Sequence, residues 1–198
     1  QKILLEELYA AREIIVNEHQ SLFVEELNDV INKVRIFGFH FATLDIRQDS
    51  RVHHKAFTQI VEDLHKIGDI TFPKNYLTLS EKEQIDILSV VKGEIDTNIL
   101  TDETSVKTIE SIYALKEIQH RNGERGANRY IISNNQTALN VMETFAMLNL
   151  CGFENELPVD VIPLFETVED LENSEEVMRT LYSNKTYRHH VSKRKNKQ

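Results

Sequence analysis

Cysteine is almost missing from this chain of 198 residues, which contains one, Cys151. A single cysteine excludes a disulfide framework and a metal site built from thiolates. It suits a reducing compartment, so we expect a cytoplasmic protein. The sequence also lacks any apolar run near the roughly 20 residues that cross a bilayer. Its N-terminus does not have the pattern of a secretory signal peptide, and we therefore expect no membrane association.

Positive charge is in short supply as well. The chain has 23 Lys and Arg against 32 Asp and Glu, which gives a net charge of −9. Binding to nucleic acid without sequence preference needs clustered basic residues that neutralise phosphates. The one basic cluster lies in the polar tail, residues 192–198, where we expect it to be solvated. This charge pattern predicts no nucleic-acid partner.

Several common catalytic patterns are absent. Gly123 and Gly126 do not have the spacing of a phosphate-binding fingerprint, and no predicted strand precedes them. No Ser-His-Asp or Cys-His motif can be read from the sequence, although a triad formed in space would escape such a reading.

The histidines do not indicate a metal site. The pairs His53–His54 and His189–His190 are adjacent in sequence, so on a helix their side chains point in different directions. His40 lies in an apolar run, and we expect it to be packed and hydrogen-bonded rather than catalytic.

The chain is long enough for one domain with a real core and too short for two large ones. It has no initiator Met and opens directly in a helical pattern. We expect a single fragment of a larger protein, with a helical lead-in over residues 1–35 and strands and helices over residues 36–191. Hydrophobic periodicity predicts helices at 3–16, 22–35, 53–66, 80–91, 104–120, 136–150 and from about 168, followed by a last polar helical piece to about 191. It predicts strands at 37–48, 130–133 and 159–165.

Each predicted strand is followed by a helix, and this order favours parallel pairing with right-handed crossovers. The expected fold class is therefore helix-rich α/β. Three strands cannot close an eight-stranded barrel. The alternatives are a small open sheet, or a partial parallel (β/α) barrel with extra helices.

The first predicted strand ends in polar residues. Residues 37–48 alternate at period two, and one face changes from phenylalanine at its start to Asp45 and Arg47 at its end. Such a strand runs from a core into a site. Arginine grips phosphate or carboxylate at two points, which makes Arg47 a candidate substrate-binding residue. An ion pair with Asp45 on the same face is the structural alternative.

The third predicted strand delivers a carboxylate. An apolar run at 161–165 ends at Glu166, before an acidic helical first turn at Glu169 and Asp170. Buried parallel strands of α/β barrels carry their chemistry at this end. A carboxylate oxygen is the type of ligand that Mg²⁺ or Mn²⁺ prefers. In the alternative, Glu166 only favours the dipole of the helix that follows.

Three segments carry a family resemblance. FGFHFATLDIRQDSRVH (37–53) and VIPLFETVEDLENS (161–174) closely resemble two characteristic stretches of phosphoenolpyruvate carboxylase, and residues 129–152 resemble the strand and helix between them. The resemblance implies an α/β barrel with added helices. It also implies that the chain is part of an enzyme that adds bicarbonate to phosphoenolpyruvate. The products of that reaction are oxaloacetate and phosphate. It further implies Mg²⁺ or Mn²⁺ as cofactor and a homo-oligomer, a tetramer by family.

The resemblance also implies site roles. Glu166, in LFETVEDL, matches the family's metal-ligating glutamate, and Arg47, in LDIRQ, matches an active-site arginine that holds the substrate phosphate. The family's second metal aspartate, its glycine-rich loop and a further catalytic histidine have no counterpart in the 198 residues, so we expect the fragment alone to be inactive. Residues 133–136 depart from the family wording. The alternative is a non-enzymatic helical interaction module.

Overall fold

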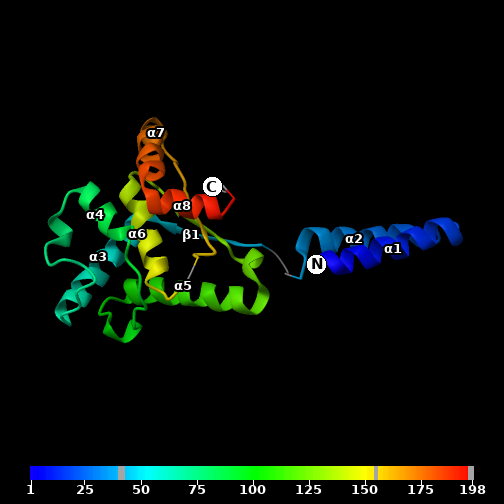
Figure 1. Ribbon diagram of the computed structural model, residues 1–198, viewed down its shortest axis with the longest axis horizontal. Helices are drawn as coiled ribbons and strands as arrows, with labels where there is room; N and C mark the ends of the chain where they lie inside the picture. Colours follow the sequence, from blue (N-terminus) through cyan, green and yellow to red (C-terminus); the bar gives the residue numbers. More distant parts are fainter. Residues whose placement is uncertain (40–42, 154–155, 196–198) are drawn as a thin grey trace. The chain divides into compact units, whose positions relative to one another are not determined.

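The chain divides after Leu44 into two units, Gln1–Leu44 and Asp45–Gln198. The structure, a computed structural model, describes residues 1–39, 43–153 and 156–195 (Figure 1). In the described ranges, no helix is long and apolar enough to cross a membrane.

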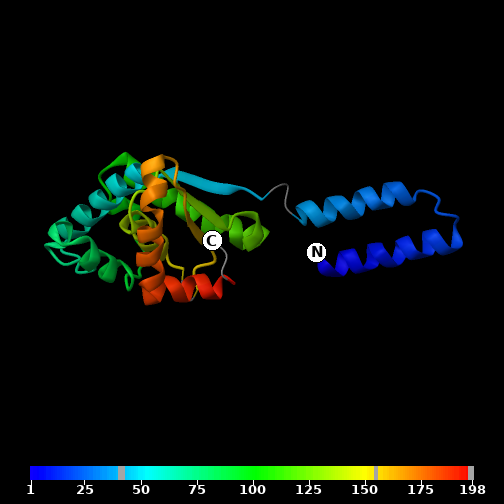
Figure 2. The same cartoon turned by 90° about the horizontal axis from the view of Figure 1, so that it is seen from above.

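The first unit is a pair of helices, α1 (Lys2–Glu18) and α2 (Val24–Phe37). They lie side by side (Figure 2). Side-chain hydrogen bonds tie them together: Arg12 Nε donates to Asn28 Oδ1 at 2.9 Å, and Gln1 Nε2 donates to the carbonyl of Val34 at 2.8 Å. Ile31 is the residue that the pair buries.

The second unit is organised around a three-stranded parallel sheet in the order β1-β2-β3. Its strands are β1 (Asp45–Asp49), β2 (Arg129–Ser133) and β3 (Asp160–Pro163). Because the strands are parallel, their carboxyl ends meet at one edge of the sheet. Parallel pairing and a helix after each strand were both predicted and are confirmed.

Helices cover this sheet and fill the connections. The α-helices of the second unit are α3 (Ser50–Lys66), α4 (Glu81–Leu88), α5 (Glu103–Asn122), α6 (Ala138–Asn149), α7 (Val168–Ser183) and α8 (Lys185–Lys193). Three short 3₁₀ segments complete the order: η1 (Tyr76–Thr78), η2 (Thr97–Ile99) and η3 (Glu124–Gly126). A capping box opens α4, with Ser80 as the cap and Glu83 as its partner.

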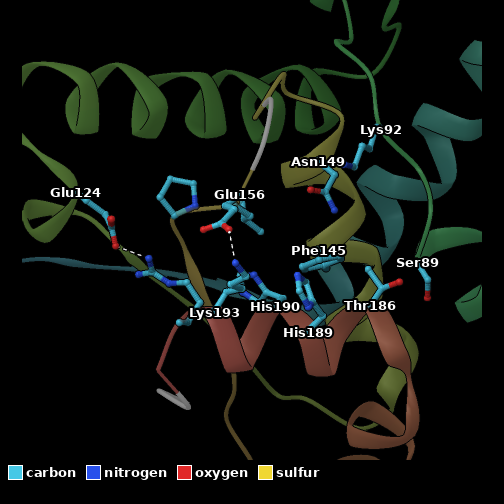
Figure 3. Close-up of a pocket in the computed structure, with 13 residues that line it drawn as sticks. Ser89, Lys92, Glu124, Phe145, Asn149, Glu156, Thr186, His189, His190 and Lys193 are labelled. Atoms are coloured by element: carbon cyan, nitrogen blue, oxygen red, sulfur yellow. Dashed lines mark hydrogen bonds and ion pairs between the residues drawn. The ribbon is translucent and has the colours of Figure 1, made fainter.

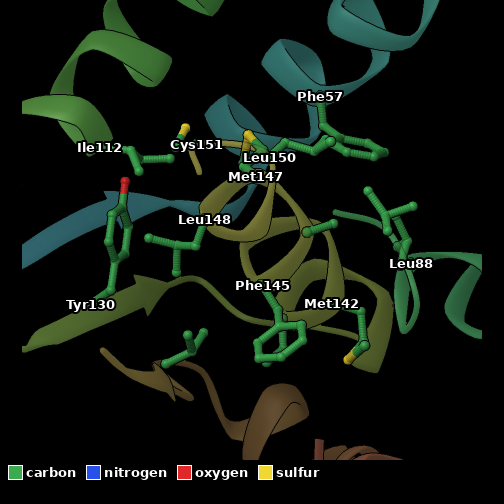
Figure 4. Packing of buried hydrophobic residues seen from close by; sticks show 14 of the residues in the cluster. Phe57, Leu88, Ile112, Tyr130, Met142, Phe145, Met147, Leu148, Leu150 and Cys151 are labelled. Carbon is green, nitrogen blue, oxygen red and sulfur yellow. The ribbon is translucent and has the colours of Figure 1, made fainter. Parts of the chain in front are cut away.

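Helix α6 lies at the centre of the core and packs against α3, α4, α7 and β3. Most of its residues are buried, because its sequence is apolar on nearly all sides. In Figure 4, Phe145 and Met142 of α6 point to the same side of the helix, and Tyr130 of β2 lies beside Ile112 of α5. This core holds the sheet from one side.

One face of the sheet is more buried than the other. On β2, Tyr130 and Ile132 are buried, whereas Arg129 is exposed and Ile131 is half-buried. The register places Arg47 of β1 beside Ile131, so Arg47 lies on the less covered face. A polar, partly open face opposite a helix-covered face is consistent with part of an α/β barrel. The helix-rich α/β fold class is therefore confirmed.

The first strand is shorter than predicted. Residues 37–48 were expected to form it, but Phe37 is the last residue of α2, and β1 begins at Asp45. Gly38 ends α2 with a φ of +63°, a conformation that glycine adopts at little cost. The helical period of α2 thus overrides the period-two pattern at its end. His40 lies outside the described residues.

The start of α6 was also misassigned. The helix was predicted to start at residue 136, but it starts at Ala138, and Thr137 is its cap and forms a capping box with Asn140. Asn134 adopts a left-handed conformation with φ +52°, and Asn135 is buried. The chain therefore makes a turn between β2 and α6 that the sequence pattern did not reveal.

Candidate functional site

Arg47, the middle residue of β1, and Glu166, which follows β3, contact each other across the sheet. An ion pair joins the Arg47 Nη2 to the Glu166 Oε1, although 119 residues separate them in sequence. Asp45, the alternative partner for Arg47, is paired with Arg129 instead, with 2.7 Å between Arg129 Nε and Asp45 Oδ1. The structure thus brings together the two residues that the sequence singled out.

The main chain around Glu166 is held in place. Beyond β3, the Leu164 N–H donates to the carbonyl of Ile132 at 2.8 Å and extends the ladder with β2. Thr167 then caps α7 through a capping box with Asp170. The backbone N–H of Thr167 donates to the Asp170 carboxylate and lowers the pKa of that carboxyl. Glu166 therefore projects from a fixed junction between strand and helix.

The ion pair itself is open to solvent. The side chain of Arg47 is 55% exposed and that of Glu166 is 37% exposed. Exposed pairs contribute about 0–1 kcal/mol to the free energy of unfolding. A pair that stabilises the fold so little leaves both groups free to exchange partners with a ligand.

Both oxygens of the Glu166 carboxylate have a partner. The backbone N–H of Asn134 donates to Oε2 at 3.1 Å, while Oε1 contacts Arg47. This arrangement spans all three strands, since Arg47 belongs to β1, Asn134 follows β2 and Glu166 follows β3. Sequence reasoning missed Asn134; its departure from the family wording at residues 133–136 was the available signal.

The Glu166 carboxylate could supply one ligand to a divalent cation. A carboxylate at Glu166 has the oxygen chemistry that Mg²⁺ prefers. No group of three His, Cys, Asp or Glu that could hold a metal occurs within the described ranges. Such ions take one or two carboxylates together with water and substrate oxygens. Glu166 therefore fits as a single ligand and not as a complete metal site.

Two histidines of α3, His53 and His54, form hydrogen bonds with buried side chains. His53 is buried, and its ring contacts the Thr144 hydroxyl at 2.7 Å and the Tyr130 hydroxyl at 2.9 Å. His54 contacts the buried Glu143 carboxylate at 2.7 Å between Nδ1 and Oε1. The two rings have separate partners, as expected for adjacent residues on a helix.

The pKa values of these two histidines are shifted in opposite directions. Burial lowers the pKa of His53 to about 4, and the hydrogen bond with Glu143 raises the pKa of His54. The stability that neutral His53 contributes is complete above about pH 6.5, the unfolded value, and is lost as pH falls toward 4. The contribution of His54 is complete below that value and is lost as pH rises through its folded pKa.

Proton NMR of the imidazole rings in the 198-residue chain, titrated between pH 3.5 and 8.5, measures both values. The variants His53→Gln and His54→Gln assign the two signals. Two overlapping titrations near the ordinary histidine value would contradict the burial of His53.

A cavity of about 420 Å³ lies elsewhere in the second unit (Figure 3). Its lining includes Pro158, which precedes β3, and His190 of α8. Two of the cations at its wall are paired: Lys193 Nζ is 3.1 Å from Glu156 Oε1, and Arg194 contacts Glu124. Neither Arg47 nor Glu166 lines this cavity, which belongs to the opposite end of the strands.

Comparison with known proteins identifies the family. The family model of phosphoenolpyruvate carboxylase matches residues 1–198, the whole chain. The chain belongs to the phosphoenolpyruvate carboxylase family. The confirmed resemblance covers the segments that contain Arg47 and Glu166, because the match leaves no part of the chain out.

Individual relatives agree with this assignment. A phosphoenolpyruvate carboxylase of Prochlorococcus marinus subsp. pastoris is 32% identical over 185 residues, which is 86% of this chain and 18% of the relative. One from a Synechococcus strain is 33% identical over 165 residues, which is 79% of this chain and 15% of the relative. The chain thus spans less than a fifth of the length of these relatives.

Proposed function

We propose that this chain is part of a phosphoenolpyruvate carboxylase, which adds bicarbonate to phosphoenolpyruvate to give oxaloacetate and phosphate. The observation that carries the proposal is the Arg47–Glu166 pair, held on a sheet of three parallel strands. The family match over the whole chain supports it. An interaction module without chemistry is less well supported, because a solvent-exposed ion pair contributes little to the fold.

Arg47 is the proposed substrate-binding and catalytic residue. It contacts Glu166 through Nη2, and a guanidinium carries five N–H donors in a fixed fork. Donors therefore remain for two oxygens of a phosphate, which arginine binds at two points. During transfer of the phosphoryl group, a cation at this position stabilises the charge on the moving oxygens.

Glu166 is the proposed ligand of Mg²⁺ or Mn²⁺. It supplies one carboxylate, so the other ligands would come from substrate, water and other parts of the longer enzyme. When bound, the ion supplies a Lewis acid for the enolate oxygen of the substrate. The part of this chain is to hold the Glu166 carboxylate at the strand ends, through Arg47 and the Asn134 N–H.

The proposal also covers the place of this chain in the enzyme, the complete barrel, the assembly and the compartment. Residues 1–198 would be one internal piece of the enzyme, with the helical lead-in predicted for 1–35, barrel strands and helices over 36–191 and a basic tail at 192–198. The sheet would be completed to a TIM barrel, and the enzyme would be a cytoplasmic homotetramer. The free cysteine Cys151 supports the reducing compartment, and the tetramer is what the family resemblance implies.

The function is tested on the full-length protein, the longer enzyme that is proposed to contain this chain. The assay measures oxaloacetate formation through a coupled reduction of the oxaloacetate. Activity that requires phosphoenolpyruvate, bicarbonate and a divalent cation is expected. A full-length protein with no carboxylase activity under these conditions would contradict the proposal and favour the interaction module.

The 198-residue chain by itself is expected to be inactive and to bind Mn²⁺ hardly better than a solvated glutamate does. The described part of the chain contains no group of three side chains that could hold a metal. Strands β1 and β3 each pair on one side within the described sheet, and open edges favour association between chains. Light scattering is therefore expected to show self-association. A monomeric, active 198-residue chain would place the site elsewhere.

A further inference from the structure

The turn after β2 has an unusual backbone. Asn134 has a φ of +52°, in the left-handed region that residues other than glycine seldom enter. Asparagine is among the few side chains that tolerate this conformation. The turn stands directly between the ends of β1 and β3, because β2 is the central strand.

The peptide bond between Asn134 and Asn135 is held at both of its polar groups. The Ser50 hydroxyl donates to the Asn134 carbonyl at 2.5 Å, and the Asn135 N–H donates to the Leu164 carbonyl at 3.1 Å. Ser50 is the first residue of α3, directly after β1, and is 2% exposed. Leu164 follows β3. One peptide is therefore fixed from both neighbouring strand ends.

This fixed peptide determines where the preceding N–H points. With the carbonyl of Asn134 held by Ser50 and its φ positive, the Asn134 N–H is directed at Glu166 Oε2, 3.1 Å away. Arg47 contacts the other oxygen. The orientation of the carboxylate thus depends on groups from all three strands.

We propose that Ser50 and the left-handed backbone of Asn134 are positioning residues that orient the Glu166 carboxylate for a divalent cation. The proposal rests on the function proposed above, in which Glu166 ligates that cation. Outer partners of metal ligands fix the orientation of the ligand, and their loss typically weakens metal binding about 10- to 100-fold.

A matched pair of substitutions at Asn134 separates the effect of its backbone conformation from the effect of its side chain. Asn134→Gly and Asn134→Ala both remove the amide, but Gly adopts a positive φ readily while Ala does not. Ser50→Ala removes the hydroxyl that holds the peptide. Ser105→Ala is the control, because Ser105 is also buried and donates to a carbonyl, that of Ala56 at 3.3 Å, away from the site.

The experiment measures Mn²⁺ binding to the full-length enzyme by electron paramagnetic resonance of the free ion, together with the activation constant for Mg²⁺. Asn134→Ala and Ser50→Ala are expected to weaken Mn²⁺ binding about 10-fold or more. Asn134→Gly is expected to bind Mn²⁺ about 10-fold more tightly than Asn134→Ala. The activation constant is expected to rise in parallel, while kcat at saturating metal falls less. Thermal unfolding shows whether each variant is folded.

The Glu166→Gln variant separates the positioning role of Ser50 and Asn134 from the role of Glu166 as a metal ligand. If Glu166→Gln weakens Mn²⁺ binding while folded Ser50→Ala and Asn134→Ala bind as the wild type does, the positioning role is wrong and the proposed function stands. Equal loss in Asn134→Gly and Asn134→Ala would also overturn the role of the backbone. If Glu166→Gln leaves Mn²⁺ binding unchanged, the metal assignment itself is wrong.

Discussion

Replacing Glu166 by Gln in the full-length enzyme is expected to weaken apparent Mg²⁺ or Mn²⁺ affinity by about 10- to 100-fold or more, judging from losses at outer-shell partners. The amide keeps the size of the side chain but removes the negative charge and one accepting oxygen. That oxygen now serves either Arg47 or the Asn134 N–H. Activation of turnover by the metal, measured over a range of metal concentrations, reports the change.

The neighbouring Glu169→Gln is a matched control. Glu169 is exposed in the first turn of α7, so its loss removes one charge from the same helix N-terminus without touching the strand ends. The free energy of unfolding should change by about 1 kcal/mol or less in Glu166→Gln, because the ion pair is exposed. A metal dependence that is the same in Glu166→Gln and Glu169→Gln would rule out Glu166 as a ligand.

Replacing Arg47 is expected to impair the use of phosphoenolpyruvate. Lys keeps the charge but has no planar fork, so Arg47→Lys should lose roughly 1.5–3 kcal/mol of transition-state stabilisation, the scale of a hydrogen bond to a charged group. This corresponds to about a 10- to 100-fold fall in kcat/KM. Arg47→Ala, which removes the cation as well, should lose more. Steady-state kinetics at saturating bicarbonate and metal measures both.

Arg51 provides the control for charge. It is exposed and pairs with Asp49, the cap of α3, at 2.7 Å between Nη2 and Oδ2. Arg51→Lys should therefore leave kcat/KM for phosphoenolpyruvate close to the wild-type value. If Arg47→Ala keeps kcat/KM intact, Arg47 serves only as the ion-pair partner of Glu166.

Much of the architecture followed from local pattern. Helical periodicity located the helices of the second unit to within a few residues, and the capping boxes at Ser80 and Thr167 mark two of their starts. The short apolar runs before Ser133 and Glu166 predicted buried parallel strands. The error at Phe37 arose where a helical and an alternating pattern overlap, and Gly38 decided between them.

The sequence by itself determined which residues could carry chemistry, because Arg47 was predicted near the end of one strand and Glu166 directly after another. In the structure Arg47 is the middle residue of β1. Only the tertiary structure decided that Arg47 and Glu166 meet. A parallel sheet in the order β1-β2-β3 brings strand ends from distant parts of the chain to one edge. The same pairing holds the turn at Asn134 between Ser50 and Leu164. No local pattern specifies that turn, since its conformation depends on hydrogen bonds from residues far away in sequence.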